Sequence, residues 1–172
     1  MSIFSKHPKI EVKPTTRDKN LVKLGWIIVA LNVLLVLVFY FDLPETIPTH
    51  FNLKGEADGF GHKSTLWIIP IISTALYFGL GFFVTRMKPY NMNFPVKVTE
   101  KNAPELYALG IRMLAVMNLA TVVAFLLTTL IFILHIKGVV GTLDVQLLLG
   151  SWIIVALLPF LYIYKMFTIP SR

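Results

Sequence analysis

Four long runs of apolar residues constrain this chain more than any other feature of its sequence. They span residues 24–41, 64–85, 113–134 and 145–164, and none contains Asp, Glu, Lys or Arg. A helix rises about 1.5 Å per residue, so about 20 residues cross the ~30 Å hydrocarbon core of a bilayer. Backbone polar groups find no water in lipid, and the sequence lacks the alternation of a β-barrel strand. The sequence therefore predicts an all-α, polytopic integral membrane protein, a bundle of four transmembrane helices.

The overall composition agrees with a membrane protein. Hydrophobic residues make up 56% of the 172 residues and charged residues 15%, whereas soluble domains are about 25% charged. This length fits one membrane domain, residues 24–165, between a basic cytoplasmic tail (1–23) and a short cytoplasmic C-terminus (166–172). The chain has no cysteine, which excludes disulfides, thiol nucleophiles and cysteine zinc sites. We expect no cofactor.

The basic residues predict how the helices are oriented. Six Lys or Arg lie in residues 1–23 and five in residues 86–112, but only two lie in residues 43–63 and one in residues 135–144. Basic loops stay in the cytoplasm, so both termini and the 86–112 loop are predicted to be cytoplasmic. Because the net charge of +7 is gathered at the ends of apolar runs, it indicates contact with the lipid bilayer and not with nucleic acid.

The polar segment 42–63, between the first two apolar runs, is the part of the chain in which we expect a site. Pro44 and Pro48 stiffen its entry, and glycines supply tight turns that need positive φ. A structured loop of about 20 residues is more often functional than idle, so we expect an ordered extracytoplasmic cap. The residues expected to form this cap or to bind a ligand are Pro48, His50, Phe51, Asn52, Gly55, Glu56, Asp58, Gly59, Gly61 and Lys63.

Several kinds of chemistry can be weighed against this segment. His50, Glu56, Asp58 and His62 are possible zinc ligands, but they show no diagnostic spacing, and Asp58-Gly59 is also an ordinary turn signal. We therefore expect no metal site, and the lack of a nucleophile elbow predicts a protein that is not an enzyme. The apolar runs contain no ionisable acid or base, which argues against ion-coupled transport. A small-solute transporter or channel component and a metal-dependent membrane hydrolase remain as alternatives.

The cytoplasmic loop before the third apolar run has two recognisable segments. Asn93-Phe94-Pro95 predicts an extended turn, because the residue before a proline avoids the α region. Asn102-Ala103-Pro104-Glu105 predicts a helix start, with Asn102 as the cap and Pro104 in the first turn. The third helix should therefore begin ahead of the membrane. We expect this start to pack under the bundle, and binding of a cytoplasmic regulator is the alternative.

One set of motifs resembles a known family. The motifs are Leu43-Pro44, Ile47-Pro48-Thr49-His50-Phe51-Asn52, Gly55-Glu56-Ala57-Asp58-Gly59-Phe60-Gly61 and Lys63, after a first apolar run. They resemble the signature of bacterial membrane domains of unknown function, and the Asn93 and Asn102 segments extend the resemblance. The same domain forms the N-terminal part of immunity proteins that protect Bacillus cells from their own sporulation-delay toxin.

The resemblance implies a multi-pass protein of the bacterial plasma membrane. It also implies a non-enzymatic protein whose outward loop binds a peptide toxin or an envelope ligand. The immunity proteins are larger, with six helices, and they also sequester a transcriptional repressor at the membrane. Four helices are predicted for this chain.

Overall fold

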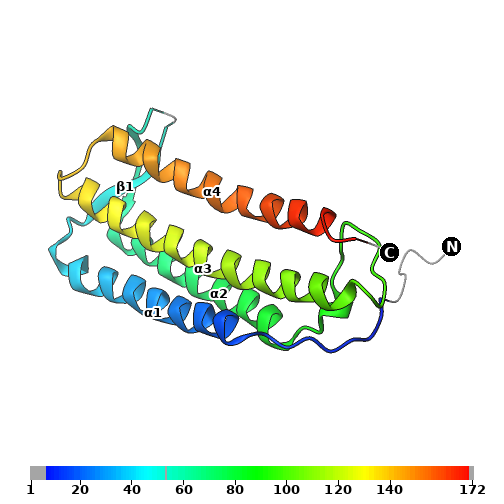
Figure 1. Ribbon diagram of the computed structural model, residues 1–172. Helices are drawn as coiled ribbons and strands as arrows, with labels where there is room; N and C mark the ends of the chain where they lie inside the picture. The colour runs from blue at the N-terminus through cyan, green and yellow to red at the C-terminus, as the bar shows by residue number, and fades with distance from the viewer. Residues whose placement is uncertain (1–6, 53, 171–172) are drawn as a thin grey trace.

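The computed structural model describes residues 7–52 and 54–170, and long helices running side by side dominate it (Figure 1). These helices are α1 (Thr16–Phe39), α2 (Ile68–Arg86), α3 (Ala103–Ile136) and α4 (Thr142–Phe167). Within the described residues, four stretches are long and apolar enough to cross a membrane, which confirms the predicted number of long apolar helices. The chain reverses direction between helices, so both termini lie at one end of the bundle, the terminal end, and we call the opposite end the hairpin end.

The helix α1 begins earlier than expected. We predicted a helix from Leu24 after a basic tail, but α1 starts at Thr16, inside that tail. The reason is a capping box: the Asp18 backbone N–H donates to the Thr15 hydroxyl oxygen at 3.3 Å, and the Thr15 N–H donates to the Asp18 carboxylate at 2.8 Å. This arrangement satisfies two of the backbone donors that every helix start leaves unpaired. The helix therefore continues beyond its apolar run.

The all-α prediction missed a small antiparallel sheet at the hairpin end. Strands β1 (Thr46–Phe51) and β2 (Ala57–His62) pair from Thr46↔His62 to Phe51↔Ala57, with register shifts around His50. Short 3₁₀ turns, η1 (Tyr40–Asp42) and η2 (Lys63–Trp67), join the hairpin to α1 and α2. The turn itself uses Gly55 at φ 80°, where a residue without a Cβ is favoured. Glycines in β2 obscured the alternation that normally predicts a strand.

The hairpin rests on a buried apolar cluster. Ile47 of β1 is buried with Val36 of α1, Leu66 of η2 and Ile133 of α3. Further along the bundle, Val29, Tyr77 and Val122 form a second cluster between α1, α2 and α3. The helix α4 packs mainly along α3; its contacts include a hydrogen bond from Trp152 Nε1 to the Thr128 hydroxyl at 3.2 Å. Three helices thus form the inner unit of the fold.

At the terminal end, Asn102 occupies the N-cap position of α3 as predicted, but its side chain does not cap the helix. Its Oδ1 accepts from the Thr99 backbone N–H at 2.8 Å. Its Nδ2 donates to the carbonyls of Lys97 at 3.1 Å and Pro170 at 3.3 Å. Pro104 lies in the first turn of α3, as expected. Asn102 therefore ties the loop and the C-terminal segment to the start of α3.

The N-terminal segment joins the same end of the bundle. The Tyr107 hydroxyl donates to the Pro8 carbonyl at 2.8 Å, and Ile10 and Val12 pack on the cluster around Tyr107. Asn93 and Pro95 are exposed and flank Phe94, whose ring lies 5.4 Å from the Tyr107 ring. The N-terminal segment and the loop before α3 thus share one small core at the terminal end.

Candidate functional site

The base of the hairpin is a polar network around Lys63. The Lys63 Nζ lies 3.0 Å from Glu45 Oε1 and donates to the Leu43 carbonyl at 3.3 Å. The second Glu45 oxygen lies 3.0 Å from His62 Nε2. The hydrogen bond from Lys63 and its positive charge hold the pKa of Glu45 below its ordinary value. Since the Lys63 ammonium also lies 5.2 Å from the centre of the Tyr40 ring, it links the hairpin to the end of α1.

The tip of the hairpin has two further polar pairs. His50 Nδ1 lies 2.5 Å from Asp58 Oδ1, across the two strands. The Asn52 amide donates to the Glu56 carboxylate at 2.9 Å, and its carbonyl oxygen accepts from the backbone N–H groups of Lys54 and Glu56. The His50 and Asp58 side chains are 72% and 45% exposed, so their pair adds only about 0–1 kcal/mol of stability. These contacts shape the tip more than they stabilise the protein.

The four possible metal ligands of the hairpin fall into separate pairs. His50 pairs with Asp58, Glu56 with Asn52, and His62 with Glu45. Across residues 7–52 and 54–170, no group of three His, Cys, Asp or Glu side chains is placed to hold a metal ion. The alternative of a metal-dependent hydrolase therefore gains no support from the described part of the chain.

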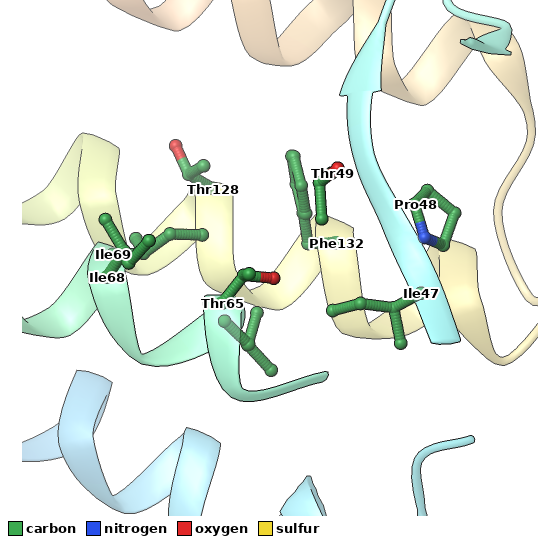
Figure 2. A pocket seen from close by; sticks show the side chains of 9 residues that line it. Ile47, Pro48, Thr49, Thr65, Ile68, Ile69, Thr128 and Phe132 are labelled. Atoms are coloured by element: carbon green, nitrogen blue, oxygen red, sulfur yellow. The ribbon is translucent and has the colours of Figure 1, made fainter. Parts of the chain in front are cut away.

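An apolar groove of about 330 Å³ lies where the hairpin meets the helix ends (Figure 2). Residues of β1 form one wall, and residues of η2, α2 and α3 form the others. The lining residues are Ile47, Pro48, Thr49, Thr65, Leu66, Ile68, Ile69, Thr128 and Phe132. The few polar groups are threonine hydroxyls, and two of these are already engaged: Thr65 donates to the His62 carbonyl at 2.9 Å and Thr128 to the Ala124 carbonyl at 2.8 Å. The groove suits an apolar ligand.

Only part of the predicted site contributes to this groove. Pro48 lines it, and Phe51 lies beside it, with its ring 5.1 Å from the Phe132 ring and 4.9 Å from the His135 ring. The remaining predicted residues form the tip and the base of the hairpin. Sequence reasoning missed the contributions of η2, α2 and α3, because nothing in an apolar run marks the residues that will face a hairpin.

Among the glycines of the hairpin, Gly55 has the positive φ that was predicted, whereas Gly59 and Gly61 have a different role. Among the described residues, positive φ occurs at Gly55 and Gly138, so the expectation of positive φ was wrong for Gly59. The requirement there is space: a Cβ on Gly59 would lie 2.9 Å from the His50 Cβ. A Cβ on Gly61 would lie 3.0 Å from the Thr49 Cγ2. Both glycines let β2 lie close to β1.

One comparison with known proteins, the match to a family model, covers this same region. Residues 27–74 match the model of a family described as Domain of unknown function (DUF1648). An uncharacterized protein of Archaeoglobus fulgidus is 45% identical over 58 residues, which are 34% of this chain and 32% of that protein. The match therefore spans about a third of the length of this curated relative. No solved structure matches the chain. The similarity is to a domain without assigned function, and its residues include the hairpin and the parts of α1 and α2 that the hairpin joins.

Proposed function

We propose that this chain is a non-enzymatic, multi-pass protein of the bacterial plasma membrane whose hairpin faces outward and binds an apolar peptide. The groove between β1, α2 and α3 carries the proposal. Six of its nine lining residues are apolar and the other three are threonines, and it lies at the helix ends, where a bound peptide can contact both the protein and the membrane surface. Peptide toxins that attack membranes present apolar side chains of this kind. The resemblance to toxin-immunity proteins supports the same ligand class.

The outward orientation rests on charge. The N-terminal segment and the 86–112 loop, which carry most of the Lys and Arg residues, lie together at the terminal end. Positive residues are retained in the cytoplasm, so the hairpin end faces outward. A reporter that is active only outside the cytoplasm should work when fused after Gly61 and fail when fused after Lys97. The opposite pattern would place the groove inside the cell.

Filling the groove tests the binding role. Thr49→Trp places a large ring at its β1 wall, whereas Thr46→Trp changes an exposed threonine of the same strand that does not line it. Sensitive bacteria that express the wild type should survive exposure to the sporulation-delay peptide toxin better than cells without it. Thr49→Trp should abolish this protection, and Thr46→Trp should retain it at equal membrane abundance. Absence of protection by the wild type, or full protection by Thr49→Trp, would refute the proposal.

A further inference from the structure

A second hollow lies at the other end of the molecule, between α1 and α2. It consists of two adjoining grooves of about 410 Å³ and 220 Å³ that share Val22, Trp26 and Thr85. The larger groove is lined by Lys19 and Lys23 of α1. The smaller one extends along the helices to other lining residues, including Phe78, Gly81 and Arg86. The hollow therefore has a basic mouth at the terminal end and an apolar floor that runs toward the middle of the bundle.

The basic mouth has no acidic partner in the described part of the chain. The ion pairs formed within residues 7–52 and 54–170 do not include Lys19, Lys23 or Arg86. The two acids of the neighbouring segment are already engaged, Glu11 by Lys88 and Asp18 by Arg112.

Lys19 and Lys23 are also one helical turn apart on α1. Like charges at this spacing repel each other and weaken a helix. An anion bound between the two ammonium groups would remove this repulsion. The geometry therefore favours a negatively charged group at the mouth of the hollow.

The position of the mouth indicates which anion. Lys23 is the last charged residue before the apolar run that starts at Leu24, so the lysines lie at the level where a membrane helix leaves the hydrocarbon core. Basic residues at this level attract anionic lipid headgroups, and Trp26 is a residue type typical of the same interface. The floor beyond it is lined mainly by apolar side chains, among them Val22, Phe78 and Phe82, which suits an acyl chain. By contrast, the described residues that line the groove at the hairpin end include no Lys or Arg.

We propose that this hollow is a binding site for an anionic phospholipid. The lipid phosphate lies between Lys19 and Lys23, with Arg86 nearby, and one acyl chain follows the apolar floor past Trp26 toward Phe78. This site is separate from the groove under the hairpin and does not depend on the function proposed for it. The bound lipid would hold α1 to α2 at the terminal end, which lies away from the polar contacts of the hairpin.

Trp26 provides a reporter for this site. In a parent carrying Trp67→Phe and Trp152→Phe, Trp26 is the remaining tryptophan. The purified full chain is reconstituted into vesicles of phosphatidylcholine and phosphatidylglycerol in which one lipid at a time carries brominated acyl chains. At equal mole fraction, brominated phosphatidylglycerol should quench Trp26 more strongly than brominated phosphatidylcholine. The preference for phosphatidylglycerol should fall about fivefold for each lysine removed in Lys19→Gln and Lys23→Gln.

A matched control separates the site from general surface charge. The exposed lysines Lys97 and Lys101 lie at the same end but outside the hollow, so Lys97→Gln/Lys101→Gln should leave the preference unchanged. Circular dichroism of each variant checks that its helices are retained. Equal quenching by both lipids in the parent, or an equal loss of preference in the control, would overturn the proposal. Displacement of the brominated lipid by millimolar glycerol phosphate would assign the site to soluble phosphate compounds and would also overturn it.

Discussion

Changing Asp18 to asparagine tests how the N-terminal segment is held to the bundle. The Asp18 side chain is 2% exposed, and its carboxylate accepts hydrogen bonds from the Thr15 N–H at 2.8 Å, from the Thr15 hydroxyl at 2.6 Å and from Arg112 Nε of α3. Arg112 also donates to the Thr15 hydroxyl at 3.0 Å. Three donors thus converge on one buried carboxylate. An asparagine of the same shape offers one acceptor oxygen and turns an NH₂ group toward a donor.

The expected loss follows from this geometry. Removing one partner of a buried ion pair costs about 3–5 kcal/mol, because the other charge stays buried without compensation. Asparagine keeps the shape and one acceptor, and Arg112 is 25% exposed, so we expect Asp18→Asn to lower the free energy of unfolding by about 3 kcal/mol. Reversible unfolding in dodecyl maltoside, driven by added sodium dodecyl sulfate and followed by circular dichroism, measures this change.

Two controls make the measurement specific. Glu11→Gln removes an ion pair with Lys88 at the same end of the molecule, but both of those side chains are more than half exposed, so unfolding should hardly change. The double variant Asp18→Asn/Arg112→Gln should lose clearly less than the sum of its single variants, because the two residues share one interaction. If Asp18→Asn unfolds like Glu11→Gln, or if the losses simply add, the reasoning about this buried pair is refuted.

Two further predictions concern the hairpin and the helix packing. Lys63 holds the pKa of Glu45 below its ordinary value of 4.5, so this contact stabilises the protein above that pH and is lost as the pH falls through the lower folded pKa. The melting temperature of the wild type should therefore fall more steeply below about pH 4.5 than that of Glu45→Gln. Parallel curves of melting temperature against pH would contradict this. Gly25→Val should destabilise the protein by about 1–3 kcal/mol, since an added Cβ would lie 2.8 Å from Cζ of the Tyr77 ring. An added Cβ at Gly79 would meet no atom within 4 Å outside the adjoining part of its own helix, so Gly79→Ala should not lower the free energy of unfolding. Equal losses in detergent unfolding would argue against the close packing of α1 on α2.

The sequence by itself determined the number of long apolar helices, because length and lack of charge decide residue by residue whether a segment suits a bilayer. It also determined the start of α3 near Asn102 and Pro104, where the local signals of a helix start agree with the structure. The capping pattern of Thr15 and Asp18 was equally local. The basic residues around it, however, favour a tail.

Only the tertiary structure decided which parts of those helices meet. A helix that is apolar on all sides has no face that the sequence can mark as buried, so nothing in the third apolar run distinguishes Thr128 and Phe132, which line the groove, from their neighbours. The strand pairing of the hairpin and the contact of Asp18 with Arg112 depend in the same way on segments brought together by folding. The composition of the hairpin indicated where a site should be sought. The other walls of the groove, however, come from η2, α2 and α3, which lie next to the hairpin only in the folded chain.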